Sequence, residues 1–257
     1  MENWLWVILK HKMYEHVLIL GCGRSGTSIF GELFNHLSTH TYYSEIDFDL
    51  YLNKDFSKPI ASKIPRENRK YQNTPGLSFP LDVLLERIPN IKIYWQLREP
   101  LDASCSLRVG ISKTWGHHPQ PPNYKDWMHE SLLKKCAHHW NYINSIGYAS
   151  IKKIAIVTKF EDLVGDASKF SRDICKQLEI DPGSHDLALK SWNPSVQNNN
   201  NEDFIEALTS RPYSTQDHHN KINRWKENLT KENLDEIVPM VRQTAAQFGY
   251  VLWNSQY

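Results

Sequence analysis

The chain has 257 residues, and its 30 lysines and arginines nearly balance its 29 aspartates and glutamates, which leaves a net charge of +1 with neutral histidines. This balance gives no electrostatic reason to expect nucleic acid or an anionic membrane as a partner. The hydrophobic fraction of 40% is enough for a folded core, and no apolar run approaches the roughly 20 residues that span a membrane.

The cysteines are widely scattered, with no C-x-x-C pair among them: Cys22, Cys105, Cys136 and Cys175. Such scattering indicates free thiols in a reducing compartment, and it argues against a disulfide framework or a zinc site. Because the amino-terminal residues also resemble neither a membrane anchor nor a cleavable signal, we expect a cytoplasmic protein.

Strand and helix patterns alternate along the chain after an amino-terminal arm, residues 1–15. Short apolar runs rich in branched residues predict buried strands at 16–20, 91–97 and 153–158. Apolar residues at helical spacing predict a helix that begins near Ser28 and further helices within 125–146, 167–178 and 231–248. Pro239 should kink or divide the last of these helices. The alternation predicts an α/β fold, a single P-loop-like domain over residues 1–257 with a central parallel β-sheet flanked by helices on both faces.

The stretch LGCGRSGTS, residues 20–28, connects the first strand to the first helix. Its glycines and the hydroxyl of Ser28 have the spacing of the phosphate-binding loop in enzymes that use nucleoside triphosphates, but Thr27 stands where that loop has its lysine. A strand, a turn and a helix in this order direct backbone N–H groups and the positive end of a helix dipole at one point. The loop is therefore predicted to bind a phosphate or sulfate oxyanion without an obligatory metal, with Arg24 as the nearby cation.

Residues 51–80 have no clear periodicity, and they contain six lysines or arginines against two acidic residues. A long irregular segment inside a compact α/β domain is commonly a lid or a substrate-binding loop. The alternative is a solvated surface loop.

The strand at 91–97 leads into a second candidate anion site. Arg98 follows the carboxyl end of this strand, where parallel α/β sheets bind ligands. A proline two residues later suits the first turn of a helix, which places Ser106 on that helix. An arginine fork and a hydroxyl together can hold a second phosphate, whereas an ion pair of Arg98 with a neighbouring carboxylate is the structural alternative.

Together the two segments resemble the cofactor motifs of sulfotransferases that use 3′-phosphoadenosine-5′-phosphosulfate (PAPS). The residues that resemble the 5′-phosphosulfate loop of this family are Gly23, Arg24, Ser25, Gly26, Thr27 and Ser28. Arg98, followed by Glu99, a proline and then Ser106, resembles the 3′-phosphate motif. The stretches KIAIVTKFEDLVGD and RWKENLTKENLDEI resemble two later regions of the family, so the resemblance covers most of the chain from residue 16 onward. It implies a parallel α/β sheet, PAPS as co-substrate, adenosine 3′,5′-bisphosphate (PAP) as product, and no metal.

Some positions depart from the common family pattern. Arg24 resembles the loop arginine of tyrosylprotein and many bacterial sulfotransferases, whereas many cytosolic members have lysine there. The resemblance assigns Arg24 to the 5′-phosphate and to the bridging oxygen, where negative charge builds as the sulfuryl group departs. Phe160 replaces the usual tyrosine and Glu99 replaces an aspartate, and we expect both changes to be structural and tolerated.

The residue that takes the acceptor's proton has more than one candidate. Members of the arginine-loop branch often use a glutamate soon after the first helix, and Glu45 stands at the matching place, with Asp47 and Asp49 nearby. Cytosolic small-molecule members use a histidine, which here would be His117 or His118. The remaining alternative is a solvated acidic loop without a catalytic role.

Further cations are candidates for the site. Lys63 resembles a lysine that some members place against the transferring sulfuryl group. Lys221 and Arg224, which precede the last helix, either cover the 3′-phosphate or lie on the surface. Trp225 beside them is either an adenine neighbour or a core residue, and its helical spacing favours the core.

Three functions are compatible with these patterns. The favoured one is a sulfotransferase that modifies a hydroxyl or amine of an acceptor that the sequence does not identify. A P-loop phosphotransferase would use a nucleoside triphosphate with magnesium, and the missing loop lysine opposes it. A non-catalytic nucleotide-binding protein would keep Arg98 and Ser106 without a usable base, and Glu45 and Lys63 oppose that alternative.

Overall fold

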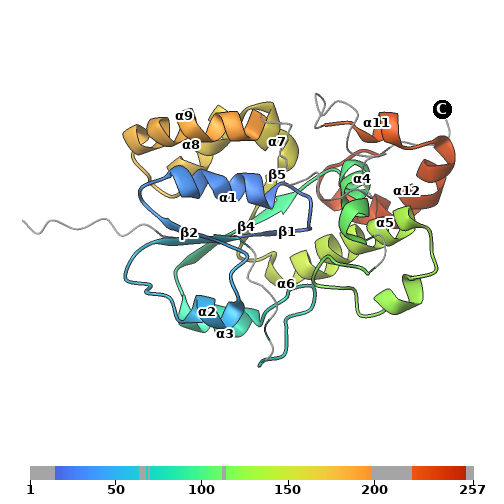
Figure 1. Cartoon of the computed structure of the whole chain (residues 1–257), viewed down its shortest axis with the longest axis horizontal. Helices are drawn as coiled ribbons and strands as arrows, with labels where there is room; N and C mark the ends of the chain where they lie inside the picture. Colours follow the sequence, from blue (N-terminus) through green and yellow to red (C-terminus); the bar gives the residue numbers. More distant parts are fainter. Residues whose placement is uncertain (1–14, 64–67, 69, 112–113, 198–221, 253–257) are drawn as a thin grey trace, which may run out of the picture.

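The computed structural model describes residues 15–63, 68, 70–111, 114–197 and 222–252. Its strands are β1 (His16–Gly21), β2 (Thr41–Ser44), β3 (Ile60–Lys63), β4 (Ile91–Leu97) and β5 (Ala155–Lys159). Within the described residues these strands form a five-stranded sheet in the order β2-β3-β1-β4-β5, and every pairing is parallel. Helices lie on both sides of the sheet (Figure 1), which confirms the predicted α/β fold.

The helices connect the strands in the way that parallel pairing requires. In the amino-terminal half they are α1 (Thr27–His36), α2 (Phe48–Leu52), α3 (Leu81–Arg87) and α4 (Pro100–Ile111). Between β4 and β5 the chain adds the 3₁₀ helix η1 (Tyr124–Trp127), α5 (Leu132–Tyr142), the π-helical turn η2 (Ile143–Gly147) and α6 (Tyr148–Ile151). After β5 come α7 (Phe160–Gly165), α8 (Ala167–Gln177), α9 (Pro182–Gln197), α11 (Trp225–Asn228) and α12 (Lys231–Gln247).

Each face of the sheet has its own apolar core, because successive side chains of a strand point to opposite faces. In β1, Val17 and Ile19 pack into the cluster that also contains buried residues of α1, α8 and α9. Leu18 and Leu20 pack into the other cluster, with residues of α4, α5 and α12. β1 therefore lies at the centre of the molecule, and the loop that follows it is supported on both sides.

Several elements differ from the sequence-based expectations. Residues 51–80 are less irregular than predicted, since β3 lies within them and pairs with both β1 and β2. Within the predicted range 125–146, α5 begins at Leu132, where the side chain of Ser131 caps it by accepting a hydrogen bond from the Lys134 N–H. α12 runs through Pro239 without being divided. Its capping box and its buried face on both sides of the proline hold the two halves in one helix.

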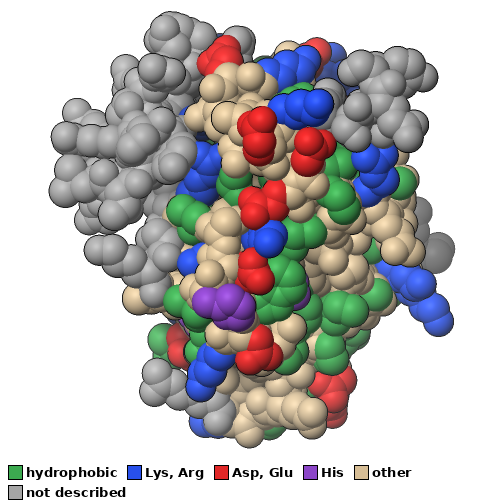
Figure 2. Space-filling view, turned by 90° about the vertical axis from the view of Figure 1, so that its right-hand side faces the viewer, with side chains coloured by type: hydrophobic (Ala, Val, Ile, Leu, Met, Phe, Trp, Pro, Cys, Tyr) green, Lys and Arg blue, Asp and Glu red, His purple; other side chains and the backbone are tan. Residues whose placement is uncertain are grey.

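Charged side chains link α5 to α12 on their outer surface. The Lys134 ammonium lies 3.0 Å from a carboxylate oxygen of Glu130 and 3.5 Å from one of Glu236 on α12. Figure 2 shows this side of the molecule, where acidic and basic side chains are interspersed with apolar ones. None of the described helices combines the length and the apolar character that a membrane crossing needs.

Candidate active site

The loop after β1 presents hydrogen-bond donors at the amino terminus of α1. Gly26 precedes this helix with φ 86°, a left-handed conformation that favours glycine, and a Cβ there would overlap the ring of Phe160. Among the described residues, no side chain caps the helix, and the fully buried Ser25 hydroxyl has no hydrogen-bond partner. Such a group normally has a partner, so the loop fits an anion that accepts from Ser25 and from the first N–H groups of α1.

Two arginines meet at the carboxyl ends of β1 and β4. The Arg24 Nε donates to the Ser106 hydroxyl at 3.1 Å, and the Arg98 Nη1 donates to the Arg24 carbonyl at 3.1 Å. The Arg98 side chain is 5% exposed, and its guanidinium lies 4.3 Å from the centroid of the Phe160 ring. The two predicted phosphate motifs are thus in direct contact, although 74 residues separate Arg24 from Arg98.

A third arginine is brought to the same place from the carboxyl-terminal region. The Asp102 carboxylate, near the start of α4, accepts from the backbone N–H of Asn223 at 2.7 Å and of Trp225 at 2.9 Å. Arg224 lies between these two anchored residues. Trp225 itself packs partly buried against the core, as predicted. Lys221 lies outside the described residues.

The arginine cluster, which we define as Arg24, Arg98 and Arg224, concentrates positive charge. Burial lowers the pKa of Arg24 to about 10, and the charges of Arg98 and Arg224 add to this effect. Burial also lowers the pKa of Arg98, with Asp102 acting in the opposite direction and Arg224 in the same one. Because like charges in a partly buried site repel one another, an anion with more than one negative group would stabilise this arrangement.

Lys63 joins the loop to Glu45. Its ammonium donates to the Ser28 hydroxyl at 2.7 Å and to the Glu45 carboxylate at 2.5 Å. The pair is fixed by the sheet, since Ser44 and Lys63 are register partners in β2 and β3 and the Glu45 N–H donates to the Lys63 carbonyl at 3.0 Å. Lys63 is buried, whereas the Glu45 side chain is 44% exposed and therefore accessible to an acceptor molecule.

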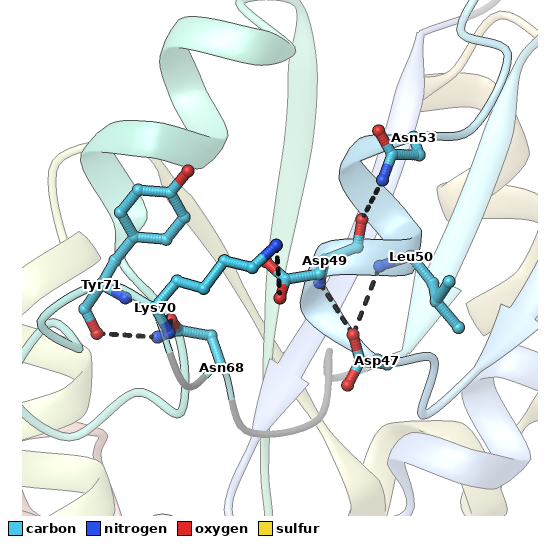
Figure 3. Close-up of polar contacts among 7 residues, drawn as sticks. All are labelled: Asp47, Asp49, Leu50, Asn53, Asn68, Lys70 and Tyr71. Atoms are coloured by element: carbon cyan, nitrogen blue, oxygen red, sulfur yellow. Dashed lines mark hydrogen bonds and ion pairs between the residues drawn. The ribbon is translucent and has the colours of Figure 1, made fainter.

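The other two carboxylates near Glu45 have local structural partners (Figure 3). Asp47 caps α2 by accepting from the N–H groups of Asp49 at 3.0 Å and Leu50 at 3.3 Å. The Asp49 carboxylate lies 3.2 Å from the ammonium of Lys70. Glu45 differs from both because its partner, Lys63, also donates to Ser28 of the loop.

Of the two candidate histidines, His117 lies at the loop and His118 is exposed. A Cβ on Gly23 would lie 2.8 Å from the His117 Nδ1, which places the imidazole against the first glycine of residues 23–28. The structure therefore brings two of the candidate bases, Glu45 and His117, close to the loop.

Three residues position the site: Phe160 and Glu99, whose departures from the family pattern were expected to be structural, and Asp102, for which the sequence predicted no role. Phe160 supports both Arg98 and Gly26, and Asp102 orders the backbone around Arg224. Glu99 accepts from the Asp102 N–H at 2.7 Å and so caps α4. A capping role for Glu99 was readable from its place before Pro100, but the partners of Phe160 and Asp102 are distant in sequence.

All four cysteines are buried free thiols, as predicted. Among the residues that the structure describes, no group of three or more histidine, cysteine, aspartate or glutamate side chains is arranged to hold a metal ion.

Comparison with solved structures identifies the fold. No protein-family model matches the sequence, and comparison with curated proteins finds no match. The fold matches mouse sulfotransferase SULT7A1 in complex with PAP, with a TM-score of 0.57 and 13% identity over 90% of this chain and 84% of that one. It also matches the sulfotransferase domain from the curacin biosynthetic pathway, with a TM-score of 0.57 and 14% identity over 94% of this chain and 99% of that one. The chain therefore has the sulfotransferase fold.

Proposed function

We propose that the protein is a sulfotransferase that moves a sulfuryl group from PAPS to a hydroxyl or amine of an acceptor. The observation that supports this most directly is the arginine cluster beside the loop at the amino terminus of α1. This arrangement suits a ligand with two separate phosphate groups, and PAPS has a 5′-phosphosulfate and a 3′-phosphate. The likeness to SULT7A1, whose structure contains PAP, supports the same ligand.

The residues divide into two groups according to the phosphate that they would hold. Residues 23–28, with the Arg24 side chain, would bind the 5′-phosphate and the bridging oxygen, where the leaving group gains charge. Arg98, Ser106 and Arg224 would bind the 3′-phosphate, with Lys221 as a further candidate. Arg98 is held by Phe160 and by the Arg24 carbonyl, so its fork is oriented before the ligand binds.

The chemistry takes place on the side of the loop that faces Glu45. PAPS supplies the sulfuryl group: its sulfur–oxygen bond to the 5′-phosphate breaks as a bond to the acceptor forms, and PAP leaves. Glu45 would take the acceptor's proton, and Lys63 would stabilise the transferring group from its position beside Ser28. The hydrogen bond from Lys63 orients the Glu45 carboxylate beside the loop.

A phosphotransferase is less well supported, because Thr27 occupies the position of the loop lysine, β4 leads into Arg98 and β5 ends at Lys159, so neither strand ends in an acidic residue. We also propose a cytoplasmic location, which the four free thiols support. The acceptor would be a small molecule or a macromolecule other than nucleic acid.

Ligand-induced stabilisation tests the cofactor assignment. We expect PAP at a hundred times its dissociation constant to stabilise the fold by about 2.7 kcal/mol, which raises the melting temperature by roughly 5 to 10 °C in a chain of this size. ATP with magnesium should give a much smaller shift. Thermal melts with each ligand distinguish the two, and a larger shift with ATP and magnesium than with PAP would favour the phosphotransferase.

Transfer of labelled sulfate from PAPS should survive a chelator. Arginine and N–H dipoles suffice for sulfuryl transfer because it moves less negative charge than phosphoryl transfer, for which kinases use magnesium. The measurement compares initial rates with and without EDTA. A rate that collapses with EDTA and recovers with added magnesium would contradict the proposed mechanism.

A further inference from the structure

The segment after α4 is held in one position by a buried side chain and three hydrogen bonds. Trp115 is fully buried, and its Nε1 donates to the His139 Nδ1 at 3.3 Å. The Gly116 N–H donates to the Gly110 carbonyl at 2.6 Å, and the Gln120 amide donates to the Trp115 carbonyl at 2.9 Å. His117 thus projects from a turn whose backbone is fixed against the end of α4.

The imidazole of His117 fills the space between the loop and α4. A Cβ on Gly23 would lie 2.8 Å from Nδ1, and a Cβ on Gly110 would overlap Nε2. A side chain at either glycine would therefore require the His117 ring to shift. The Nδ1 edge of the ring therefore faces the loop, and the Nε2 edge faces α4.

The environment of Nε2 indicates which nitrogen has the proton. Nε2 is buried and has no hydrogen-bond partner among the described residues. A buried N–H without an acceptor is rarer in proteins than a buried acceptor without a donor. We infer that the neutral ring has its proton on Nδ1, the nitrogen beside Gly23. Burial lowers the pKa of His117 to about 4, with Arg24 and His118 acting in the same direction and Glu45 opposing them, so the ring is neutral at pH 7.

Resting on the proposed function, we propose that His117 binds the cofactor by donating a hydrogen bond from Nδ1 to an oxygen of the 5′-phosphosulfate held by residues 23–28. The same ring touches Gly23 and interacts electrostatically with both Arg24 and Glu45, so it borders the side of the loop on which transfer would occur. A neutral donor at this position adds a contact to the anion without adding to the repulsion within the arginine cluster. His117 would then be a binding residue distinct from the base.

A pair of amide variants tests this assignment, because each amide can replace a different ring nitrogen. In His117→Asn the amide nitrogen can take the place of Nδ1, whereas in His117→Gln the amide extends toward the place of Nε2. Calorimetry measures the affinity of each variant for PAP and for adenosine 3′-monophosphate, which lacks the 5′-group. We expect His117→Gln to bind PAP about tenfold more weakly than the wild type, which is the size of one hydrogen bond to a charged acceptor, and to bind adenosine 3′-monophosphate equally well. His117→Asn should bind both ligands like the wild type, and so should His129→Ala, which alters an exposed histidine away from the loop.

The outcomes separate this inference from the proposed function. A wild type that does not prefer PAP to adenosine 3′-monophosphate would overturn the cofactor assignment itself. A wild type that prefers PAP, with His117→Gln keeping the full preference, would overturn only the role of His117. Equal losses for both ligands, accompanied by a lower melting temperature, would show that His117 only supports the packing of the loop, and this too would overturn the inference.

Discussion

Replacing Glu45 with glutamine is expected to lower turnover by about 10² to 10⁴-fold while cofactor affinity stays within a factor of about two. Glutamine is nearly isosteric and can still accept a hydrogen bond from Lys63, but it cannot take a proton from the acceptor. The backbone at this position is fixed by the bond from the Glu45 N–H to the Lys63 carbonyl, so the side chain should keep its place. Initial rates at saturating acceptor and calorimetry with PAP measure the two quantities.

Asp49→Asn is the matched control for this experiment. Asp49 lies on the helix that follows Glu45, and its partner Lys70 has a side chain that is 67% exposed, so the pair is worth at most about 1 kcal/mol. Its turnover should remain within about twofold of the wild type. Removing the charge of Glu45 also leaves the buried Lys63 without this counter-ion, so melting temperatures must accompany the rates. Near-normal turnover of Glu45→Gln together with a collapse in His117→Ala would assign the base to the histidine.

Replacing Arg98 with alanine is expected to weaken PAP binding by about 2 kcal/mol, or roughly 30-fold, because a charge-assisted fork to the 3′-phosphate is lost. The variant should distinguish PAP from adenosine 5′-monophosphate roughly 30-fold less well than the wild type, since the 3′-phosphate would have lost its main partner. Calorimetry with the two nucleotides measures this selectivity.

Arg87→Ala controls for the loss of an arginine in general. Arg87 lies at the end of α3, where its guanidinium packs 5.6 Å from the centroid of the Phe56 ring, and its Nε donates to the Leu52 carbonyl. Its replacement should leave both nucleotide affinities unchanged. If Arg98→Ala kept the wild-type preference for PAP, or if the wild type had no preference, the 3′-phosphate would have to be placed elsewhere.

Local sequence pattern is enough to predict the parallel α/β sheet and the loop in which we propose the anion site. β1, β4 and α8 are long enough for their apolar periodicity to be recognised, and the predicted bounds of β4 agree with the observed ones. The glycines of the loop and the arginine after β4 can be interpreted from their sequence neighbours, because turn conformation and strand ends depend on neighbouring residues. The two segments proposed to bind phosphate can therefore be located from the amino-acid sequence alone.

The short strands β2 and β3 were not predicted, because four residues such as TYYS or IASK contain too little periodicity to identify a strand. Both are stabilised by pairing with distant segments: β3 lies between β1 and β2, and this strand order alone brings Lys63 beside Ser28 and Glu45. Tertiary packing likewise makes Asp102 order the chain around Arg224 and places His117 on Gly23. Local pattern specifies which elements form, but the distances between side chains at the site depend on long-range pairing and packing, which no local periodicity encodes.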